Sequence, residues 1–383
     1  MSIMVKNLYK NGSFLYKMNL IAGKNGMDNL VQWVHIIEDD NVTSFLHGNE
    51  LVFTAGILNS HKEWLLNFAR KLYETRVSAF VVNIGPHTKD ISAEVVAYCD
   101  EVGMPLFTIP WETKMVDMTR DFCHRIMNNE HVEHTIATKF KNIIFNIGDI
   151  DAQFMQMERY GYQRGSQFRF IAVGVSGADM EEYKDALKLS AETIAKNIHD
   201  LFISFSYQNF LMLVLVNYSP EETETFVSRF TRVIKQELKG AIANLGISSV
   251  QEGIYNQNTN FEKAISALEM ARKRGELYSY YDKLGIYKVL YAVGDKDVLR
   301  SYYHEVIGKL ESYDRENHTQ LTQLLRAYLE NDGSLKLVSE EQYVHRNTVT
   351  NQLKKIEKII GYDPLLLEDK VKLFMGFYIR DIL

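Results

Sequence analysis

The chain has 383 residues, of which 46% are hydrophobic and 24% are charged, and its formal net charge is −6 at pH 7. This length predicts two to three domains, and the composition is that of an ordinary globular protein. The negative charge argues against a chain that binds nucleic acid over its whole surface. No signal peptide is predicted, no apolar run approaches the ~20 residues of a membrane-spanning helix, and two cysteines make no disulfide framework. We therefore expect a protein of the reducing cytoplasm.

Residues 1 to about 128 alternate short apolar segments with amphipathic ones. The expected elements are strands at 31–37, 50–54, 79–84 and 106–109 and helices at 60–76 and 91–102. This alternation of strands and helices favours an α/β domain with a mainly parallel sheet, on which the helices pack.

The ends of these predicted strands are candidates for a ligand site, since ligands bind at the carboxyl ends of strands in sheets of this class. Each strand end leads into a glycine or a proline. The residues there that could line a small-molecule pocket with an aromatic wall are Thr54, Gly56, Asn83, Gly85, Trp111 and Glu112. The alternative, which the sequence favours equally, is that they are ordinary loop exits.

The segment from residue 113 to about 157 is predicted to be largely helical, so that residues 129–167 form a helical linker. Such a helix can also carry the seam of a dimer. His131 and His134 have i, i+3 spacing, but a pair of histidines without further ligands is a weak metal signal. A solvated polar face is the preferred interpretation, and no metal ligand is predicted.

Residues 168–285 form a separate unit with the predicted element order βαββαβ, which is that of a ferredoxin-like sandwich. The expected strands are 168–175, 201–206, 210–216 and one near Ile247, and the expected helices are 180–199, 220–239 and 261–274. The predicted hairpin tip, residues 207–209, has no carboxylate to hold a divalent cation against phosphates. A structural or dimerising role without catalysis is therefore preferred for this domain.

After a predicted helical connector at residues 286–317, residues 318–383 form an all-α unit with helices at 318–330, 334–342, 346–360 and 368–383. Gly333 ends the first helix, Ser334 is a good N-cap for the second, and a tight turn at 343–344 precedes the third. In the third helix the apolar residues at helical spacing are Val349, Leu353, Ile356 and Ile360. For the last helix we expect Val371, Phe374, Met375, Tyr378 and Ile382 to be buried. The second and third helices are in helix-turn-helix relation.

The polar side of the third helix has the residue types that read DNA, because amides and hydroxyls hydrogen-bond base edges and lysines bind phosphates. Arg346, Asn347, Thr350, Asn351 and Lys354 are the candidates for the major groove. Lys355 and Lys358 are the candidates for phosphate contact, and His345 and Thr348 complete the predicted DNA-binding set. The alternative is a small helical bundle with a solvated lysine face.

Three parts of the chain resemble known proteins. The sequence segments HRNTV and LKKIEKIIG resemble the C-terminal helix-turn-helix of the PucR/CdaR group of bacterial transcriptional regulators. NLVQWVHIIE, GNELVFTAGI, FVVNIG and GMPLFTIPWE resemble the N-terminal domain of purine-catabolism regulators, and EKAISALEMARKRG resembles their GGDEF-like middle domain. The chain departs from the family pattern at residues 350–352, where an arginine–tyrosine–arginine run is usual, and at Ser339 and Gln342, where alanine and leucine are usual.

The resemblance implies a transcriptional regulator of purine or other nitrogen catabolism. It implies that the protein binds double-stranded DNA, responds to a small-molecule effector and is a homo-oligomer such as a dimer. It implies no enzymatic activity and no cofactor. Two other functions stay open at this point. One is a nucleotide-binding enzyme or signalling protein built on the GGDEF-like domain, although no nucleophile elbow, P-loop or dinucleotide-binding glycine motif is present. The other is a ligand-binding protein whose last helices bind another protein.

Overall fold

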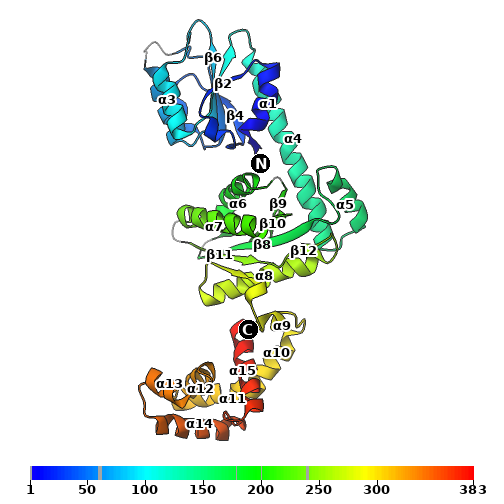
Figure 1. Cartoon of the computed structure of the whole chain (residues 1–383), viewed down its shortest axis with the longest axis vertical. Helices are drawn as coiled ribbons and strands as arrows, with labels where there is room; N and C mark the ends of the chain where they lie inside the picture. The colour runs from blue at the N-terminus through cyan, green and yellow to red at the C-terminus, as the bar shows by residue number, and fades with distance from the viewer. Residues whose placement is uncertain (1, 59–62, 178, 200, 239–240) are drawn as a thin grey trace. The chain divides into compact units, whose positions relative to one another are not determined.

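The computed structural model describes residues 2–58, 63–177, 179–199, 201–238 and 241–383 (Figure 1). The chain divides into two compact units. The first comprises Met1–Ala243 with Val250–Phe261, and the second comprises Asn244–Ser249 with Glu262–Leu383. Both units contain helices and strands, and the last third of the chain is helical.

The N-terminal part of the first unit contains a five-stranded sheet in the order β2-β7-β6-β5-β4. Its strands are β2 (Asn19–Ala22), β4 (Trp33–Ile36), β5 (Glu50–Thr54), β6 (Ala79–Ile84) and β7 (Leu106–Pro110). Strands β4 to β7 are parallel, and β2 runs antiparallel to β7. The predicted mainly parallel sheet is confirmed. The strand expected at 31–37 is divided, because Leu30–Val31 (β3) pairs instead with Ile3–Met4 (β1).

Helices cover both faces of this sheet. The helices α2 (Trp64–Glu74) and α3 (Ala93–Val102) pack on the face that carries Val52, Phe80 and Val82. The helices α1 (Val5–Leu15) and α4 (Met115–Ile144) pack on the other face, with Phe53, Val81 and Phe107. The alternation of buried residues along each strand sends successive side chains to opposite cores. The N-terminal half of the helix expected at 60–76 falls partly on residues 59–62, which lie outside the described residues.

The sequence interpretation missed β1, α1 and β2. The helix α1 buries Val5, Leu8 and Gly12. Position 12 is a glycine because a Cβ there would lie 3.0 Å from the Met18 sulfur and 3.1 Å from the Phe122 ring. A helix whose contact face includes glycine has a weak apolar signal in the sequence.

The long helix α4 contributes to two cores, as its interrupted apolar pattern predicts. Met118, Phe122 and Ile126 pack against the N-terminal sheet. Phe140, near its other end, stacks on Phe168 with ring centroids 5.1 Å apart. The helix continues through the polar residues between these two halves (Figure 1), and α5 (Ile150–Glu158) follows it.

The middle part begins with β8 (Gln167–Ser176), α6 (Met180–Lys196), β9 (Phe202–Tyr207), β10 (Phe210–Val216) and α7 (Pro220–Glu237). Strand β10 pairs antiparallel with β8 and with β9. The β9–β10 hairpin turns at Gln208 and Asn209, with Gln208 at φ +49°. A capping box between Ser219 and Glu222 begins α7. The next elements are β11 (Ile242–Ile247), β12 (Gln251–Glu252) and α8 (Gln257–Arg274).

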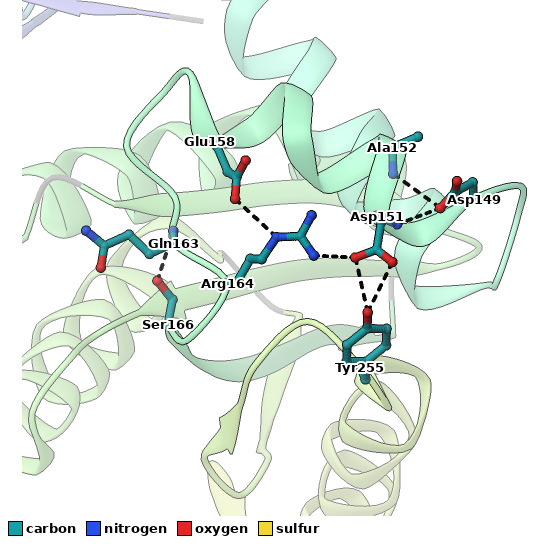
Figure 2. Close-up of polar contacts among 8 residues, drawn as sticks. All are labelled: Asp149, Asp151, Ala152, Glu158, Gln163, Arg164, Ser166 and Tyr255. Atoms are coloured by element: carbon teal, nitrogen blue, oxygen red, sulfur yellow. Dashed lines mark hydrogen bonds and ion pairs between the residues drawn. The ribbon is translucent and has the colours of Figure 1, made fainter.

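A surface network holds the loop between α5 and β8 (Figure 2). The Arg164 guanidinium pairs with Asp151 and, at 3.2 Å, with Glu158, and the Tyr255 hydroxyl donates to Asp151 at 3.1 Å. Hydrogen bonds from Arg164 first and Tyr255 second lower the pKa of the Asp151 carboxyl. Because these groups are open to solvent, we expect the network to order the loop more than it stabilises the fold.

The second unit is helical after β13 (Tyr278–Tyr280), which pairs parallel with β11. Its helices are α9 (Tyr287–Tyr291), α10 (Lys296–Tyr303), α11 (Lys309–Asn317), α12 (Leu321–Glu330), α13 (Leu335–Glu341), α14 (Arg346–Ile360) and α15 (Leu367–Ile382). A π-helical turn, η4 (His304–Gly308), joins α10 to α11. The connector predicted at 286–317 is therefore helical, as expected, but in three pieces.

Two expectations for this unit were wrong in detail. The helix expected at 318–330 begins at Leu321, because His318 adopts a left-handed conformation, φ +52°, that ends α11. In α15 Val371 is 57% exposed, contrary to expectation. Phe374, Met375, Tyr378 and Ile382 do pack against the cores but are only partly buried. The fully buried side chains, Leu373, Phe377 and Ile379, were not predicted. The contact face of α15 includes Gly376, where a Cβ would lie 2.7 Å from an Ile307 side-chain carbon, so the face is not marked by large residues.

Some findings bear on which kinds of site the described residues contain. No helix among them is long and apolar enough to cross a bilayer. No group of three or more His, Cys, Asp or Glu side chains in the described ranges is placed to hold a metal ion. Cys99 is a buried free thiol, and burial raises its pKa to about 12.

Candidate nucleic-acid interface

The turn between α13 and α14 is closed by backbone hydrogen bonds. The Ser334 hydroxyl accepts a hydrogen bond from the Leu337 amide and caps α13. At the other end of this helix, the Val344 amide donates to the Ser339 carbonyl at 3.0 Å, and Tyr343 lies at φ +54°. This is a Schellman-type helix end with tyrosine where glycine is usual. It redirects the chain within a few residues, as a helix-turn-helix requires.

The helix α14 begins and ends as its sequence predicts. The Nδ1 atom of His345 accepts a hydrogen bond from the Asn347 amide at 3.2 Å, so His345 is the N-cap. Gly361 ends the helix at φ +79°. The four apolar residues predicted to face a core are all buried: Val349, Leu353, Ile356 and Ile360. They join side chains from α12, α13 and α15 in one cluster.

A polar stripe lies on the opposite side of α14. It consists of Asn347, Asn351, Lys354 and Lys358, which are all exposed. Their spacing is i, i+4, i+7, i+11, the same as that of the buried stripe but two residues earlier. Because two residues are about 200° of rotation in a helix with 3.6 residues per turn, this outward stripe is centred almost opposite the core. Two amides near the N-terminal end and two ammonium groups beyond them therefore point to solvent.

The other residues predicted to bind DNA lie on the flanks of this outward stripe. Arg346 and Thr348 are exposed, and the Thr350 hydroxyl donates to the Arg346 carbonyl at 3.1 Å. The Lys355 ammonium lies 4.9 Å from the centroid of the Tyr313 ring on α11. A cation over an aromatic face is held by that ring, so Lys355 is less available to phosphate than the lysines of the outward stripe.

The sequence interpretation overlooked Tyr343 as a surface residue of this interface. Its side chain is 95% exposed and stands in the turn directly before α14. The signal that could have found it is its position in the two-residue turn, in which the other residue, Val344, packs against the core.

The six residues predicted to form a ligand pocket do lie at the ends of β5, β6 and β7, but several of them are engaged in packing. The Thr54 hydroxyl donates to Glu38 at 3.3 Å, and Glu38 also accepts hydrogen bonds from the Ala55 and Ile57 amides. Glu38 follows β4, and the sequence interpretation did not include it. Asn83 is only 4% exposed, and its amide oxygen has no hydrogen-bond partner among the described residues.

The two glycines at these strand ends are explained by close contacts. A Cβ on Gly56 would lie 2.5 Å from the Thr88 hydroxyl oxygen, and one on Gly85 would lie 2.3 Å from the Trp111 ring. Trp111 is 42% exposed and contacts His87, and Glu112 is exposed. Trp111, which the sequence analysis proposed as an aromatic wall, thus lies beside Gly85 and against His87.

Comparison with protein families gives two matches, one near each end of the chain. Residues 7–126 match the Purine catabolism regulatory protein-like family, and residues 321–379 match the PucR C-terminal helix-turn-helix domain. The second match begins at Leu321 and includes α12, α13 and α14 with most of α15.

Curated relatives come from Bacillus subtilis (strain 168). The chain is 23% identical over 266 residues to the DNA-binding transcriptional activator AdeR, an alignment that covers 67% of this chain and 62% of AdeR. It is 27% identical over 122 residues to the proline-responsive transcriptional activator PutR, covering 31% and 30% of the two chains. It is 28% identical over 133 residues to the purine catabolism regulatory protein, covering 33% of this chain and 25% of that one. The chain thus spans about three fifths of AdeR and less of the other two.

Among solved structures, the regulator of polyketide synthase expression from Bifidobacterium adolescentis is similar over 64% of this chain and 97% of its own, with 21% identity and a TM-score of 0.33.

Proposed function

We propose that the chain is a transcriptional regulator of the PucR family that binds specific DNA sites, because its residues 7–126 and 321–379 match the N-terminal segment and the C-terminal helix-turn-helix of that family. The observation that carries the proposal is the outward stripe of α14. Its two amides can hydrogen-bond base edges in a major groove, and its two lysines can bind the adjacent phosphates. Arg346 and Thr350 on one flank are positioned to add base contacts, and His345, Thr348 and Lys355 lie at the edges.

The regulator responds to a small-molecule effector and controls a catabolic pathway, of purines or another nitrogen compound. The names of two relatives, one proline-responsive and one of purine catabolism, support this class of signal. The effector site that we propose is at the strand ends of the N-terminal sheet, where Asn83 has a buried amide oxygen without a partner among the described residues and Trp111 provides an aromatic wall. A buried polar atom without a partner is uncommon and favours a ligand that donates to it.

The middle part acts as a ferredoxin-like, GGDEF-like domain without catalysis. Its element order from β8 to β11 and its antiparallel pairing of β10 with β8 and β9 support this assignment. The turn of the β9–β10 hairpin contains Gln208 and Asn209, which have no carboxylate for a magnesium ion. The alternative of a nucleotide-binding enzyme predicts turnover of a nucleoside triphosphate, and an assay of hydrolysis or cyclisation distinguishes the two.

The protein works in the cytoplasm as a homodimer or larger homo-oligomer. Two helix-turn-helix units related by a two-fold axis bind half-sites about one turn of DNA apart or a multiple of it. The length and interrupted apolar pattern of α4 are compatible with a contact between copies. Sedimentation of the full chain with and without operator DNA tests the assembly.

The test of DNA reading compares two variants on cognate and random duplexes by fluorescence anisotropy. Asn347→Ala should weaken binding to the cognate site by about 1–3 kcal/mol and leave random DNA unaffected, because it removes a base contact. Lys358→Ala should weaken both duplexes alike, because it removes a phosphate contact.

Two matched controls accompany this test. Gln323→Ala removes an exposed amide from α12 and should change neither affinity. Lys355→Ala removes the lysine that lies over Tyr313 and should weaken binding less than Lys358→Ala. Equal losses on both duplexes from Asn347→Ala and Gln323→Ala would contradict the assignment of α14 as the reading helix.

A further inference from the structure

A cavity outside the two sites above lies within the first unit. It has a volume of about 860 Å³ and is lined by α4, α6, β9 and the first residues of the chain. This volume is in the range of pockets that hold metabolites and cofactors. His131 and His134, the pair that the sequence analysis assigned to a solvated polar face, are on its wall.

The charge of the cavity wall is opposite to that of the whole chain. Five lysines and three glutamates line the cavity, an excess of two positive charges in a protein of net charge −6. Four of these lysines are paired with acids. On the wall itself, Lys196 lies 2.7 Å from Glu133 and Lys188 lies 3.7 Å from Glu192. Beyond the wall, Lys6 pairs with Asp28 at 2.8 Å and Lys184 pairs with Glu181 at 2.9 Å. The Lys141 ammonium has no ion-pair or hydrogen-bond partner within the described part of the chain, and it projects from α4 into this wall.

A second, independent observation also points to a ligand. Ser2 is completely buried, and its hydroxyl has no hydrogen-bond partner among the residues that the structure describes, although its carbonyl accepts from Asn129 at 2.9 Å and from Lys196 at 3.2 Å. One Glu133 carboxylate oxygen at the same wall is likewise buried without a partner. Buried polar groups are nearly always satisfied, so these two atoms are fitted to hydrogen-bond a bound molecule.

We propose that this cavity binds a small organic anion, whose carboxylate or phosphate group pairs with Lys141 and whose hydroxyl or amino group bonds Ser2 and Glu133. The site is separate from the strand ends of the N-terminal sheet and from α14, so the proposal does not depend on the DNA-binding assignment. Since the wall includes both residues that precede the N-terminal sheet and elements of the middle part, a molecule bound here contacts both parts of the unit.

The test uses the full chain and four named probes in two pairs: glutamate with glutamine, and adenosine 5′-monophosphate with adenosine. In each pair the two molecules differ chiefly in anionic charge, and the pairs separate a carboxylate ligand from a phosphate ligand. We expect calorimetric binding below about 1 mM for at least one anionic member and at least tenfold weaker binding for its uncharged or less charged partner, because a charge-assisted contact is lost.

The location is tested with variants and hydrogen exchange. Lys141→Gln should weaken the anionic probe roughly tenfold, whereas Lys139→Gln, a lysine of the same helix that is not on the cavity wall, should leave its affinity unchanged. The double variant Lys354→Gln/Lys358→Gln removes the outward lysines of α14 and should also bind the probe normally. Bound probe should slow amide exchange at residues 129–141, 184–196 and 202–206, and not at 346–358.

Three results would overturn the proposal: no anionic probe binds, Lys141→Gln binds it as wild type does, or protection appears only in α14. If the double variant loses DNA binding but still binds the probe normally, the probe site is separate from α14. The loss of DNA binding then bears only on the regulator assignment.

Discussion

At the scale of single residues, Asp314 has a role in the helix-turn-helix unit that its place in the sequence does not reveal. Its carboxylate accepts hydrogen bonds from the Thr319 hydroxyl at 2.6 Å and from the Leu321 and Thr322 amides at 2.9 and 2.8 Å. It thus caps α12 from the preceding helix, where Gln320, the residue at the N-cap position, makes no side-chain cap. Burial raises the pKa of this carboxyl, but the hydrogen bonds lower it by more, so that the net shift is downward from 3.8.

We predict that Asp314→Ala lowers the free energy of unfolding by about 1–2 kcal/mol, the usual effect of a lost helix cap. Because the folded-state pKa is lowered, the contribution of Asp314 is complete above its ordinary pKa and is lost as the pH falls through the folded-state value. Urea unfolding of the two proteins should therefore differ at pH 7, begin to approach each other below about pH 4, and converge once the pH is below the folded-state pKa. Glu316→Gln, on the same helix and exposed, is the control. A difference that persists unchanged into acid would show that the carboxylate is not the cap.

At the scale of elements, α14 has two stripes with opposite tasks. The buried stripe fixes the helix on α12, α13 and α15, and the outward stripe leaves amides and lysines in solvent. The tyrosine at φ +54° in the preceding turn adopts a conformation that costs an L-residue about 1–2 kcal/mol, which the packing of α14 offsets. Stability and the proposed DNA contact are thus divided between faces of the same helix.

This division predicts that the two stripes respond differently to truncation. Ile356→Ala, at a fully buried position, should lower the free energy of unfolding by about 2–5 kcal/mol through the cavity it leaves. Asn351→Ala, on the outward stripe, should change stability by less than about 0.5 kcal/mol and still weaken binding to cognate DNA. Thermal unfolding followed by circular dichroism, with anisotropy at a temperature where both variants are folded, measures the two effects. An unstable Asn351→Ala protein would mean that this face is not free.

At the scale of the whole molecule, the distribution of charge sets how DNA binding depends on salt. The chain carries −6 in total, but the segment from Arg346 to Lys358 has four basic residues and a single acidic one, Glu357. In the proposed DNA complex the local basic surface binds phosphates and releases their counterions, while the acidic remainder disfavours binding to random DNA.

We predict that the logarithm of DNA affinity falls linearly with the logarithm of salt concentration. Lys358→Ala should make this slope less negative by about one, since one phosphate contact is lost, and Asn347→Ala should leave it unchanged. Anisotropy titrations of the full chain between about 50 and 200 mM salt measure the slopes. An affinity that does not vary with salt would favour the alternative in which the last helices bind another protein.

The sequence by itself determined the elements whose signals are local. The strands β5, β6 and β10 have the predicted ends, and α14 begins at Arg346 and ends before Gly361. These elements have strong periodicity together with caps or turn residues at their ends, so neighbouring residues suffice to define them. The buried stripe of α14, and with it the opposite outward stripe, could be read from spacing alone.

Only the tertiary structure decided features that depend on residues far apart in the chain. It placed Lys355 over Tyr313, gave the α12 cap to Asp314, and made Gly376 part of the buried face of α15. It also put five lysines from three separate helices around one cavity, which no local pattern indicates. Hydrophobic periodicity records which face of an element is apolar, whereas the partner of a side chain, and the space left between elements, are set by how those faces pack together.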